Sequence, residues 1–293
     1  MSSITFGRYV PYDTFVHRLD SRNKLFLTIL LMVAIFFQFR VWSTTIFFSL
    51  ILFILLILLM VISRVSFIQL FSSLKGMWLL IIILFAIYIF IPNSNYSGPV
   101  AFNIGFDVYW QAIYQAGYII LRLILMLALM MILTSTTTPM NLTYAFEWYM
   151  APLKLIKVPV HAIAMVLSIA LRFIPTLLEE SDRIMKAQSS RGVDFNHGRL
   201  MKRFKAIISL IIPLFISAID RSEELANAME ARGYDPNAKR TRYRKLTFSW
   251  KDLIALVVVG SLFAGIIVFY VFDKNSPDGI NVLNELFNWE IGF

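Results

Sequence analysis

Long apolar runs are the feature that most limits what this chain can fold into. Five runs hold only two charged residues between them: residues 25–39, 41–62, 74–91, 112–133 and 253–272. Inside a bilayer every backbone N–H and C=O needs a partner within the protein, so apolar runs of this length form membrane-spanning helices. The chain is 58% hydrophobic and 15% charged, which is unlike soluble globular domains. We therefore expect an all-α integral membrane protein with about five transmembrane helices.

Two of these runs carry a further constraint. The first is about 15 residues long, whereas roughly 20 residues at 1.5 Å each are needed to cross about 30 Å of hydrocarbon. This span must therefore use flanking residues or thin the bilayer locally. The fourth run contains Arg122, and an arginine at membrane depth is expected to face protein or water rather than lipid.

The distribution of Lys and Arg predicts which side of a cell membrane each segment faces. Residues 134–251 hold 18 of the 27 basic residues and 10 acidic ones, whereas residues 92–110 hold no Lys or Arg. Short basic segments stay on the cytoplasmic side, so the N-terminus is expected inside and the C-terminus outside. The chain then divides into residues 1–133 with four spans, a cytoplasmic helical domain of residues 134–251, and residues 252–293 with the last span and an external tail.

The cytoplasmic domain contains two apolar stretches, residues 158–171 and 206–219. Each has about 14 residues, which is too short to cross a bilayer unaided, and each continues into a charged segment. We expect two helices about 45 Å long that lie along or under the membrane, each kinked at an internal proline, Pro175 or Pro213. Residues 140–154 predict a short interfacial helix before them. In an alternative arrangement the two apolar stretches form a membrane hairpin, which gives seven spans.

A short pattern, A-x-x-[S/A]-R-G-x-D, occurs twice, at residues 187–194 and 41 residues later at 228–235. Each copy ends a helical run with Arg followed by Gly, which is typical of a helix that ends in a left-handed Gly with a cation at its negative pole. Only these ends match closely, while the helix bodies differ. The repeat therefore indicates that the two arginines bind two equivalent sockets on a partner. The alternative is that each arginine only interacts with the dipole of its own helix, which contributes about 0.3–1 kcal/mol. The predicted binding residues are Ser190, Arg191, Gly192, Ala231, Arg232 and Gly233.

The chain resembles the transmembrane T component (EcfT) of energy-coupling factor transporters, a branch of ATP-binding-cassette importers. The resemblance covers most of the chain. It rests on the two Arg-Gly pairs, on residues 17–25 (HRLDSRNKL) and on residues 171–175 (LRFIP). The chain departs from the family pattern at Ser190, where the family has Ala, and at Ser21, where it usually has Pro.

The resemblance implies that Arg191 and Arg232 each insert into a groove on one of two cytoplasmic ATPase subunits. It also implies that the long coupling helices contact a small membrane subunit that binds a vitamin or a metal ion for uptake. The chain has no G-x-x-x-x-G-K-[ST] loop for ATP phosphates, so energy must come from a partner and we expect no enzyme activity or cofactor. The basic residues 239–245 lie beside a span and are expected to meet lipid headgroups rather than nucleic acid.

Two other classes of function remain open. The first is a membrane enzyme with an interfacial acidic site, for which the candidates are Glu179, Glu180, Asp182, Glu223, Glu224 and Glu230. Exposed helix faces explain most of them, since Glu180 and Arg183 have ion-pair spacing, and a chain with no Cys and three His is a poor metal binder. The second is a self-sufficient permease, which needs polar residues inside spans that hold almost none. Replacing Glu179, Glu180 and Asp182 with Ala discriminates, because it would abolish turnover with assembly intact only if the protein is an enzyme.

Overall fold

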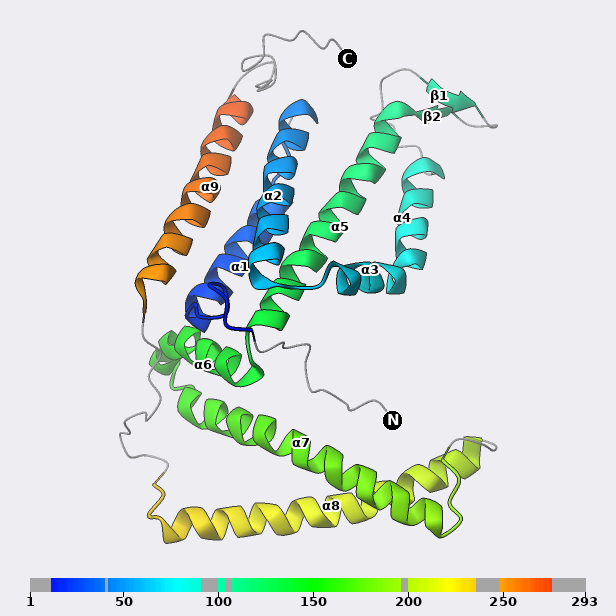
Figure 1. Cartoon of the computed structure of the whole chain (residues 1–293), viewed down its shortest axis with the longest axis vertical. Helices are drawn as coiled ribbons and strands as arrows, with labels where there is room; N and C mark the ends of the chain where they lie inside the picture. Colours follow the sequence, from blue (N-terminus) through cyan, green and yellow to red (C-terminus); the bar gives the residue numbers. More distant parts are fainter. Residues whose placement is uncertain are drawn as a thin grey trace. The chain divides into compact units, whose positions relative to one another are not determined.

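The computed structural model describes residues 12–39, 42–90, 100–103, 107–195, 200–235 and 248–275. In chain order the elements are α1 (Ser21–Phe36), α2 (Trp42–Ser63), α3 (Phe67–Gly76), α4 (Trp78–Phe90), β1 (Val100–Asn103), β2 (Asp107–Tyr109), α5 (Trp110–Thr136), α6 (Pro139–Tyr149), the 3-10 helix η1 (Ala151–Ile156), α7 (Val160–Ser190), α8 (Leu200–Ala231) and α9 (Trp250–Asn275). The predicted helical fold is confirmed (Figure 1). The short antiparallel pair β1–β2 was not predicted.

The chain forms two compact units. The first comprises residues 1–142 and 246–293, and the second comprises residues 143–245. The first unit holds α1 to α5 and α9, and the second holds most of α6 together with η1, α7 and α8. The chain therefore crosses between the units twice, once within α6 and once between residues 245 and 246.

The number of candidate spans matches the expectation, although the helices that qualify differ. Among the described helices, four are long and apolar enough to cross a membrane, and the bent pair of α3 and α4 makes a fifth if it is counted as one span. The four are Thr44–Ser63, Trp110–Thr136, Val160–Ser190 and Trp250–Asn275. α1 has 16 residues, or about 24 Å, and is shorter than a full span. α7 qualifies although its apolar part was predicted to be too short, whereas α8 does not, and a membrane hairpin would need both.

The third apolar run is broken, so the helix predicted over residues 74–91 is bent: its first residues belong to α3 and the rest to α4. α3 ends at Gly76, the N–H of Met77 donates to the carbonyl of Leu74 at 3.0 Å, and α4 then leaves at an angle of 62°. α3 is amphipathic and has no buried residue, whereas α4 is apolar throughout. Gly costs about 1 kcal/mol relative to Ala inside a helix, so the axis breaks at the junction between these two patterns.

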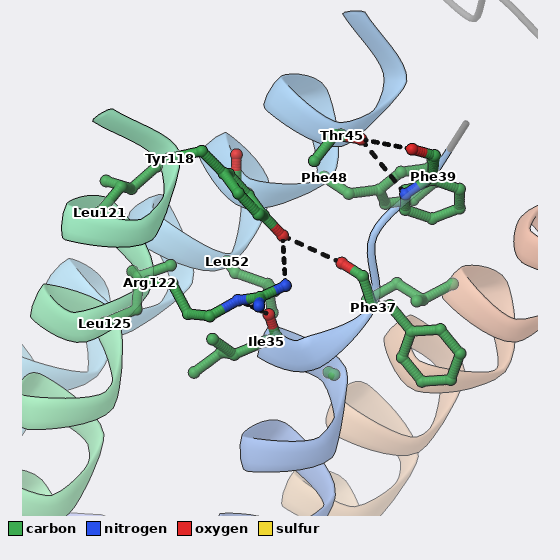
Figure 2. Close-up of a pocket in the computed structure, with 13 residues that line it drawn as sticks. Ile35, Phe37, Phe39, Thr45, Phe48, Leu52, Tyr118, Leu121, Arg122 and Leu125 are labelled. Carbon is green, nitrogen blue, oxygen red and sulfur yellow. Dashed lines mark hydrogen bonds between the residues drawn. The ribbon is translucent and has the colours of Figure 1, made fainter. Parts of the chain in front are cut away.

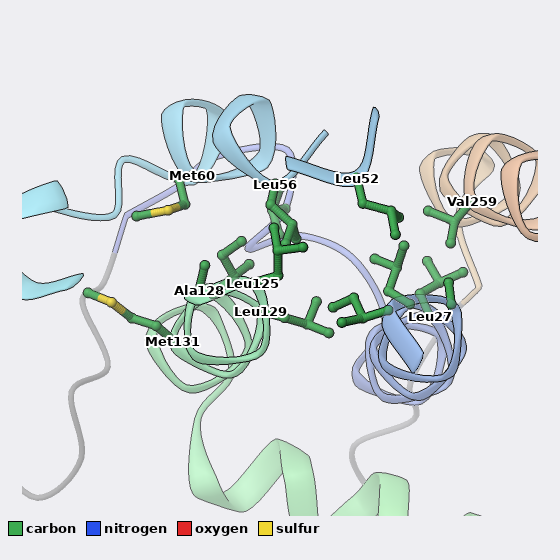
Figure 3. Close-up of a cluster of buried hydrophobic side chains, with 14 of the residues drawn as sticks. Leu27, Leu52, Leu56, Met60, Leu125, Ala128, Leu129, Met131 and Val259 are labelled. Atoms are coloured by element: carbon green, nitrogen blue, oxygen red, sulfur yellow. The ribbon is translucent and has the colours of Figure 1, made fainter. Parts of the chain in front are cut away.

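The core of the first unit lies between α1, α2, α5 and α9. Leu52, Leu56 and Met60 recur every four residues, so they lie on one face of α2, where each is at most 4% exposed. Figure 3 shows the side chains from the other helices that meet them: Leu27 of α1, Leu125, Ala128 and Leu129 of α5, and Val259 of α9. Between helices in lipid the stabilisation comes from close van der Waals packing.

The C-terminal end of the short helix α1 is held by Arg122 of α5. The Arg122 guanidinium donates from Nε to the carbonyl of Ile35 at 3.2 Å (Figure 2) and from Nη2 to the carbonyl of Phe36 at 3.1 Å. Arg122 also donates to the Tyr118 hydroxyl at 2.9 Å, which in turn donates to the carbonyl of Phe37 at 3.1 Å. The expectation that Arg122 faces protein or water rather than lipid is confirmed, because its guanidinium supplies donors to the last carbonyls of a helix that ends early.

The turn from α1 to α2 is closed by Thr45. Its hydroxyl accepts from the N–H of Phe39 at 3.2 Å and donates to the carbonyl of Phe39 at 3.3 Å. The Phe39 ring stacks on Phe48 at 4.9 Å between centroids. Both backbone polar groups of Phe39, the last described residue before this connection, are therefore paired.

Replacing Arg122 with Met should destabilise the first unit, because the last carbonyls of α1 lose their charged donor. The expected loss is about 1–3 kcal/mol, which lowers the melting temperature in detergent by roughly 2–4 °C per kcal/mol. Tryptophan fluorescence during heating measures this change. Tyr118→Phe removes one hydroxyl and should cost less. An Arg122→Met protein that melts at the wild-type temperature would contradict this role.

Candidate functional site

α7 and α8 form one pair of helices in the second unit. They contact one another and run in opposite directions (Figure 1), so their C-terminal ends lie at opposite ends of the pair. The Arg221 guanidinium of α8 donates to Glu180 of α7 at 3.3 Å, and Arg183 lies 3.8 Å from the same carboxylate. The predicted Glu180–Arg183 pair is confirmed. The Arg221 contact was missed, because it depends on how the two helices are aligned.

The end of α7 is closed by a left-handed glycine, as predicted. Gly192 has a φ of 86°, its N–H donates to the carbonyl of Ser189 at 3.0 Å, and the N–H of Val193 donates to the carbonyl of Gln188 at 3.1 Å. These two bonds form the Schellman motif, which occupies the last carbonyls of a helix with backbone donors. Arg191 is the last residue before the glycine and leaves the helix at this turn.

The end of α8 repeats the same geometry. Gly233 has a φ of 69°, its N–H donates to the carbonyl of Glu230 at 2.9 Å, and the N–H of Tyr234 donates to the carbonyl of Met229 at 3.0 Å. Arg232 precedes this glycine as Arg191 precedes Gly192. The two copies of the sequence pattern therefore fold into two copies of one local structure.

Both arginine side chains are exposed, as are their neighbours Ser190 and Ala231. Within the described part of the chain, no hydrogen bond or ion pair engages the guanidinium of Arg191 or of Arg232. The Ser190 hydroxyl, which Ala231 lacks, donates to the carbonyl of Lys186 in its own helix at 3.1 Å. The hydroxyl is therefore satisfied locally, and the two ends present similar outer surfaces.

An open groove adjoins the end of α7. Its lining comes from the residues after the helix and from the first turns of α8: Gly192, Val193, Asp194, Lys202, Lys205, Ala206 and Ser209. Two lysines give this groove a positive rim. The basic segment of residues 239–245 lies outside the described residues.

The acidic residues considered for an enzyme do not form a cluster. Glu180 is half-buried in its ion pairs, whereas the other five side chains are exposed along two helices: Glu179, Asp182, Glu223, Glu224 and Glu230. No group of three His, Asp or Glu side chains in the described residues could hold a metal ion.

The fold and these helix ends define a multi-pass helical membrane protein that carries two matching, exposed arginines on one helix pair. The model of the CbiQ family, described as cobalt transport protein, matches residues 13–243. Over 266 residues the chain is 43% identical to the energy-coupling factor transporter transmembrane protein EcfT of Bacillus subtilis (strain 168), covering 89% of this chain and 97% of that one. The protein of the same name from Brevibacillus brevis is 45% identical over 259 residues, covering 88% and 95%. That from Staphylococcus aureus is 42% identical over 261 residues, covering 88% and 94%.

The chain belongs to the family of EcfT transmembrane components of energy-coupling factor transporters. The resemblance found in the sequence is thereby confirmed. Members of this family are transmembrane transporter subunits without catalytic activity of their own, which removes the membrane-enzyme alternative.

Gly192→Ala and Gly233→Ala should each loosen the last turn of their helix. An added Cβ would meet no atom within 4 Å at either position, so the cost is the left-handed backbone itself, about 1–2 kcal/mol. Amide hydrogen exchange at residues 188–193 or 229–234 should accelerate roughly 5-fold to 30-fold. Gly117→Ala in α5 is the control and should not accelerate exchange, because Ala favours a helix interior. Unchanged exchange at the altered end would refute the capping role.

Proposed function

We propose that this chain is the scaffold through which two cytoplasmic ATP-binding-cassette ATPase subunits drive uptake of a vitamin or a metal ion. The substrate is bound by a separate small membrane subunit. The observation that carries the proposal is the pair of exposed arginines, each presented by the same glycine-capped turn at opposite ends of one helix pair. Two identical ends suit two identical or homologous partners.

The chemistry of the helix ends supports sockets on the ATPase subunits as their binding sites. A guanidinium offers five donors in a rigid fork that matches carboxylates. The last carbonyls of α7 and α8 are already occupied by backbone N–H groups, so capping their own helices does not require Arg191 or Arg232. If each guanidinium is desolvated in a socket, truncating one should weaken the complex by about 2–5 kcal/mol. The proposed contact residues are Ser190, Arg191, Gly192, Ala231, Arg232 and Gly233.

The apolar first halves of the long helices support contact with the bilayer and with the substrate-binding subunit. Eight large apolar side chains of α8 are exposed over four turns: Phe204, Ile207, Ile208, Ile211, Ile212, Phe215, Ile216 and Ile219. A continuous exposed face of this kind marks a protein or membrane contact. The polar second half of each helix would then reach the ATPases, so that movement of a socket tilts the apolar half.

The proposed arrangement in the membrane follows the charge distribution. Residues 1–133 and 252–293 supply the spans, and residues 134–251 form the cytoplasmic coupling-helix domain. The N-terminus lies in the cytoplasm and the C-terminus outside the cell, because the basic segments gather on one side.

Replacing both Arg191 and Arg232 with Glu should abolish co-purification of the ATPase subunits, because each socket then meets a charge of the wrong sign. The matched control is Lys154→Glu with Lys157→Glu, which makes the same change in net charge at exposed positions of the same unit, before α7. Affinity purification in mild detergent, followed by mass spectrometry of the bound subunits, measures the effect. A double Arg191/Arg232 variant that still binds both ATPases and supports uptake would refute the proposed function.

Single cysteines test the orientation, since the chain has none of its own. A membrane-impermeant maleimide added to intact cells should label Asp107→Cys, which lies in the strand before α5, and should leave Ser249→Cys unlabelled until the cells are opened. Labelling of Ser249→Cys in intact cells, with Asp107→Cys protected, would reverse the proposed topology.

A further inference from the structure

A buried carboxylate near the start of α9 holds the N-terminal segment. Asp252 is completely buried. Its Oδ1 accepts from the N–H of Asp20 at 2.7 Å, its Oδ2 accepts from the N–H of Ser249 at 2.8 Å, and its backbone carbonyl accepts from the Asn23 amide at 2.8 Å. Two of these hydrogen bonds tie the start of α1 to Asp252, and the third joins Asp252 to the residue that precedes α9.

A buried lysine extends this contact to α5. Lys24 is 6% exposed, and its ammonium donates to the carbonyl of Thr136 at 2.9 Å and to the carbonyl of His17 at 3.2 Å. Thr136 is the last residue of α5, so the lysine places a positive charge against the negative end of that helix. The hydroxyls of Ser135, Thr136 and Thr137 are buried and have no partner in the described part of the chain. The Lys24 hydrogen bond thus fixes the C-terminal end of α5, where the three hydroxyls have no hydrogen-bond partner among the described residues.

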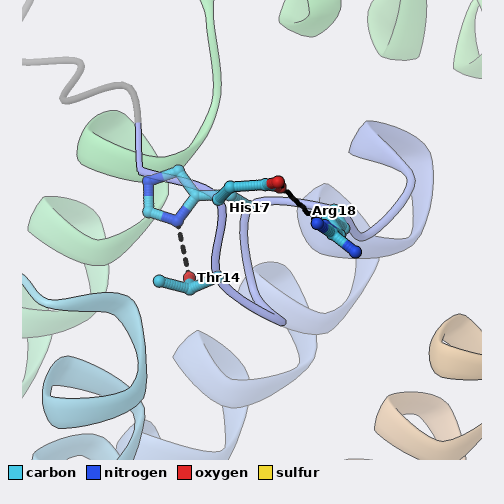
Figure 4. A network of polar contacts seen from close by, with 4 residues as sticks. Thr14, His17 and Arg18 are labelled. Atoms are coloured by element: carbon cyan, nitrogen blue, oxygen red, sulfur yellow. Dashed lines mark hydrogen bonds and ion pairs between the residues drawn. The ribbon is translucent and has the colours of Figure 1, made fainter.

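The turn that precedes α1 is itself braced. The Thr14 hydroxyl lies 2.7 Å from Nδ1 of His17, and Arg18 donates from Nε to Asp13 at 2.6 Å (Figure 4). The Arg18 hydrogen bond lowers the pKa of Asp13 below its ordinary value. Val16, between these pairs, is buried in the core. This turn fixes the carbonyl of His17 that Lys24 uses.

The network lies where the chain enters and leaves the second unit. Thr136 comes six residues before the crossing at residues 142–143, and Asp252 comes six residues after residue 246, where the chain returns. The N-terminal segment therefore contacts both ends of the first unit that continue into the coupling helices: the end of α5 and the start of α9.

We propose that this network, the N-terminal clasp (His17, Asp20, Asn23, Lys24, Thr136, Ser249 and Asp252), positions the ends of α5 and α9 as one rigid body. Because the clasp keeps these two helix ends rigid, a movement of the coupling helices is transmitted to the membrane helices. Without it, the two chain connections between the units would bend and the movement would be lost. Hydrogen bonds of buried charges to backbone groups suit this task, since hydrogen bonds that involve a charged group are stronger than those between neutral groups. The inference rests on the proposed function and assigns a mechanical role to residues 17–25.

The distance between α5 and α9 tests the clasp in the scaffold alone. Spin labels on Thr134→Cys and Leu253→Cys, both at exposed positions of a chain without other cysteines, should give a narrow distance distribution by double electron–electron resonance. Adding Lys24→Met should broaden it. The control is Lys75→Met, which removes an exposed cation of α3 outside the clasp and should leave the distribution narrow. A distribution that stays narrow with Lys24→Met overturns the proposal.

Coupling is measured in proteoliposomes that hold the scaffold, its ATPase subunits and a riboflavin-binding membrane subunit, with tritiated riboflavin as the probe. Lys24→Met should keep ATPase binding and hydrolysis, while uptake per ATP hydrolysed falls about tenfold. Asn23→Leu removes the hydrogen bond to the Asp252 carbonyl without leaving a buried charge unpaired, so it replaces Lys24→Met if that protein does not insert into the membrane. It should lower uptake per ATP hydrolysed by a smaller factor. Wild-type uptake per ATP in both variants overturns the proposal. If the ATPases stay bound after Arg191→Glu and Arg232→Glu, the proposed function fails, while the distance measurement stands or falls independently.

Discussion

The backbone N–H and C=O groups at a helix end that lies within or at the edge of a bilayer need hydrogen-bond partners, and this requirement organises the first unit. α1 has 16 residues and cannot carry its own hydrogen bonds across the whole hydrocarbon layer. At its C-terminal end Arg122 supplies the donors that its last carbonyls lack. At its N-terminal end Asp20 accepts from the N–H of Arg22 and, through its own N–H, reaches Asp252. A helix too short to span is thereby fixed at both ends by side chains or backbone groups of its neighbours, and the core of α1, α2, α5 and α9 packs around it.

The last carbonyls of α7 and α8 obtain their hydrogen-bond donors from the backbone rather than from a side chain. There the last carbonyls bond to N–H groups at and after Gly192 and Gly233, so no side-chain cation is needed to cap them. Arg122 and Lys24 satisfy carbonyls of their own chain, whereas Arg191 and Arg232 remain exposed. This contrast separates an arginine that completes a helix from one that is available to another protein. It is the physical reason for proposing that partner proteins bind at the helix ends.

A scaffold that transmits motion needs stiff connections as well as attachment points. The apolar halves of α7 and α8 and their capped ends belong to the second unit, whereas the clasp around Lys24 and Asp252 belongs to the first. The proposed coupling requires both, because a rigid helix moves nothing if its connections yield. The buried charges near the connections thus acquire a role that stability alone does not demand, since apolar packing could replace them at little cost.

The sequence by itself determined the helical class, the two long helices and their ends, because hydrophobic runs and an Arg-Gly step are local signals that the backbone obeys. It also indicated that Arg122 faces protein or water rather than lipid. Only the tertiary structure decided which carbonyls Arg122 bonds and that Lys24 meets Thr136, 112 residues away. These features depend on which helices become neighbours and in what alignment. Neither a periodic pattern nor a motif carries that information, because such contacts are fixed by packing rather than by local backbone preference.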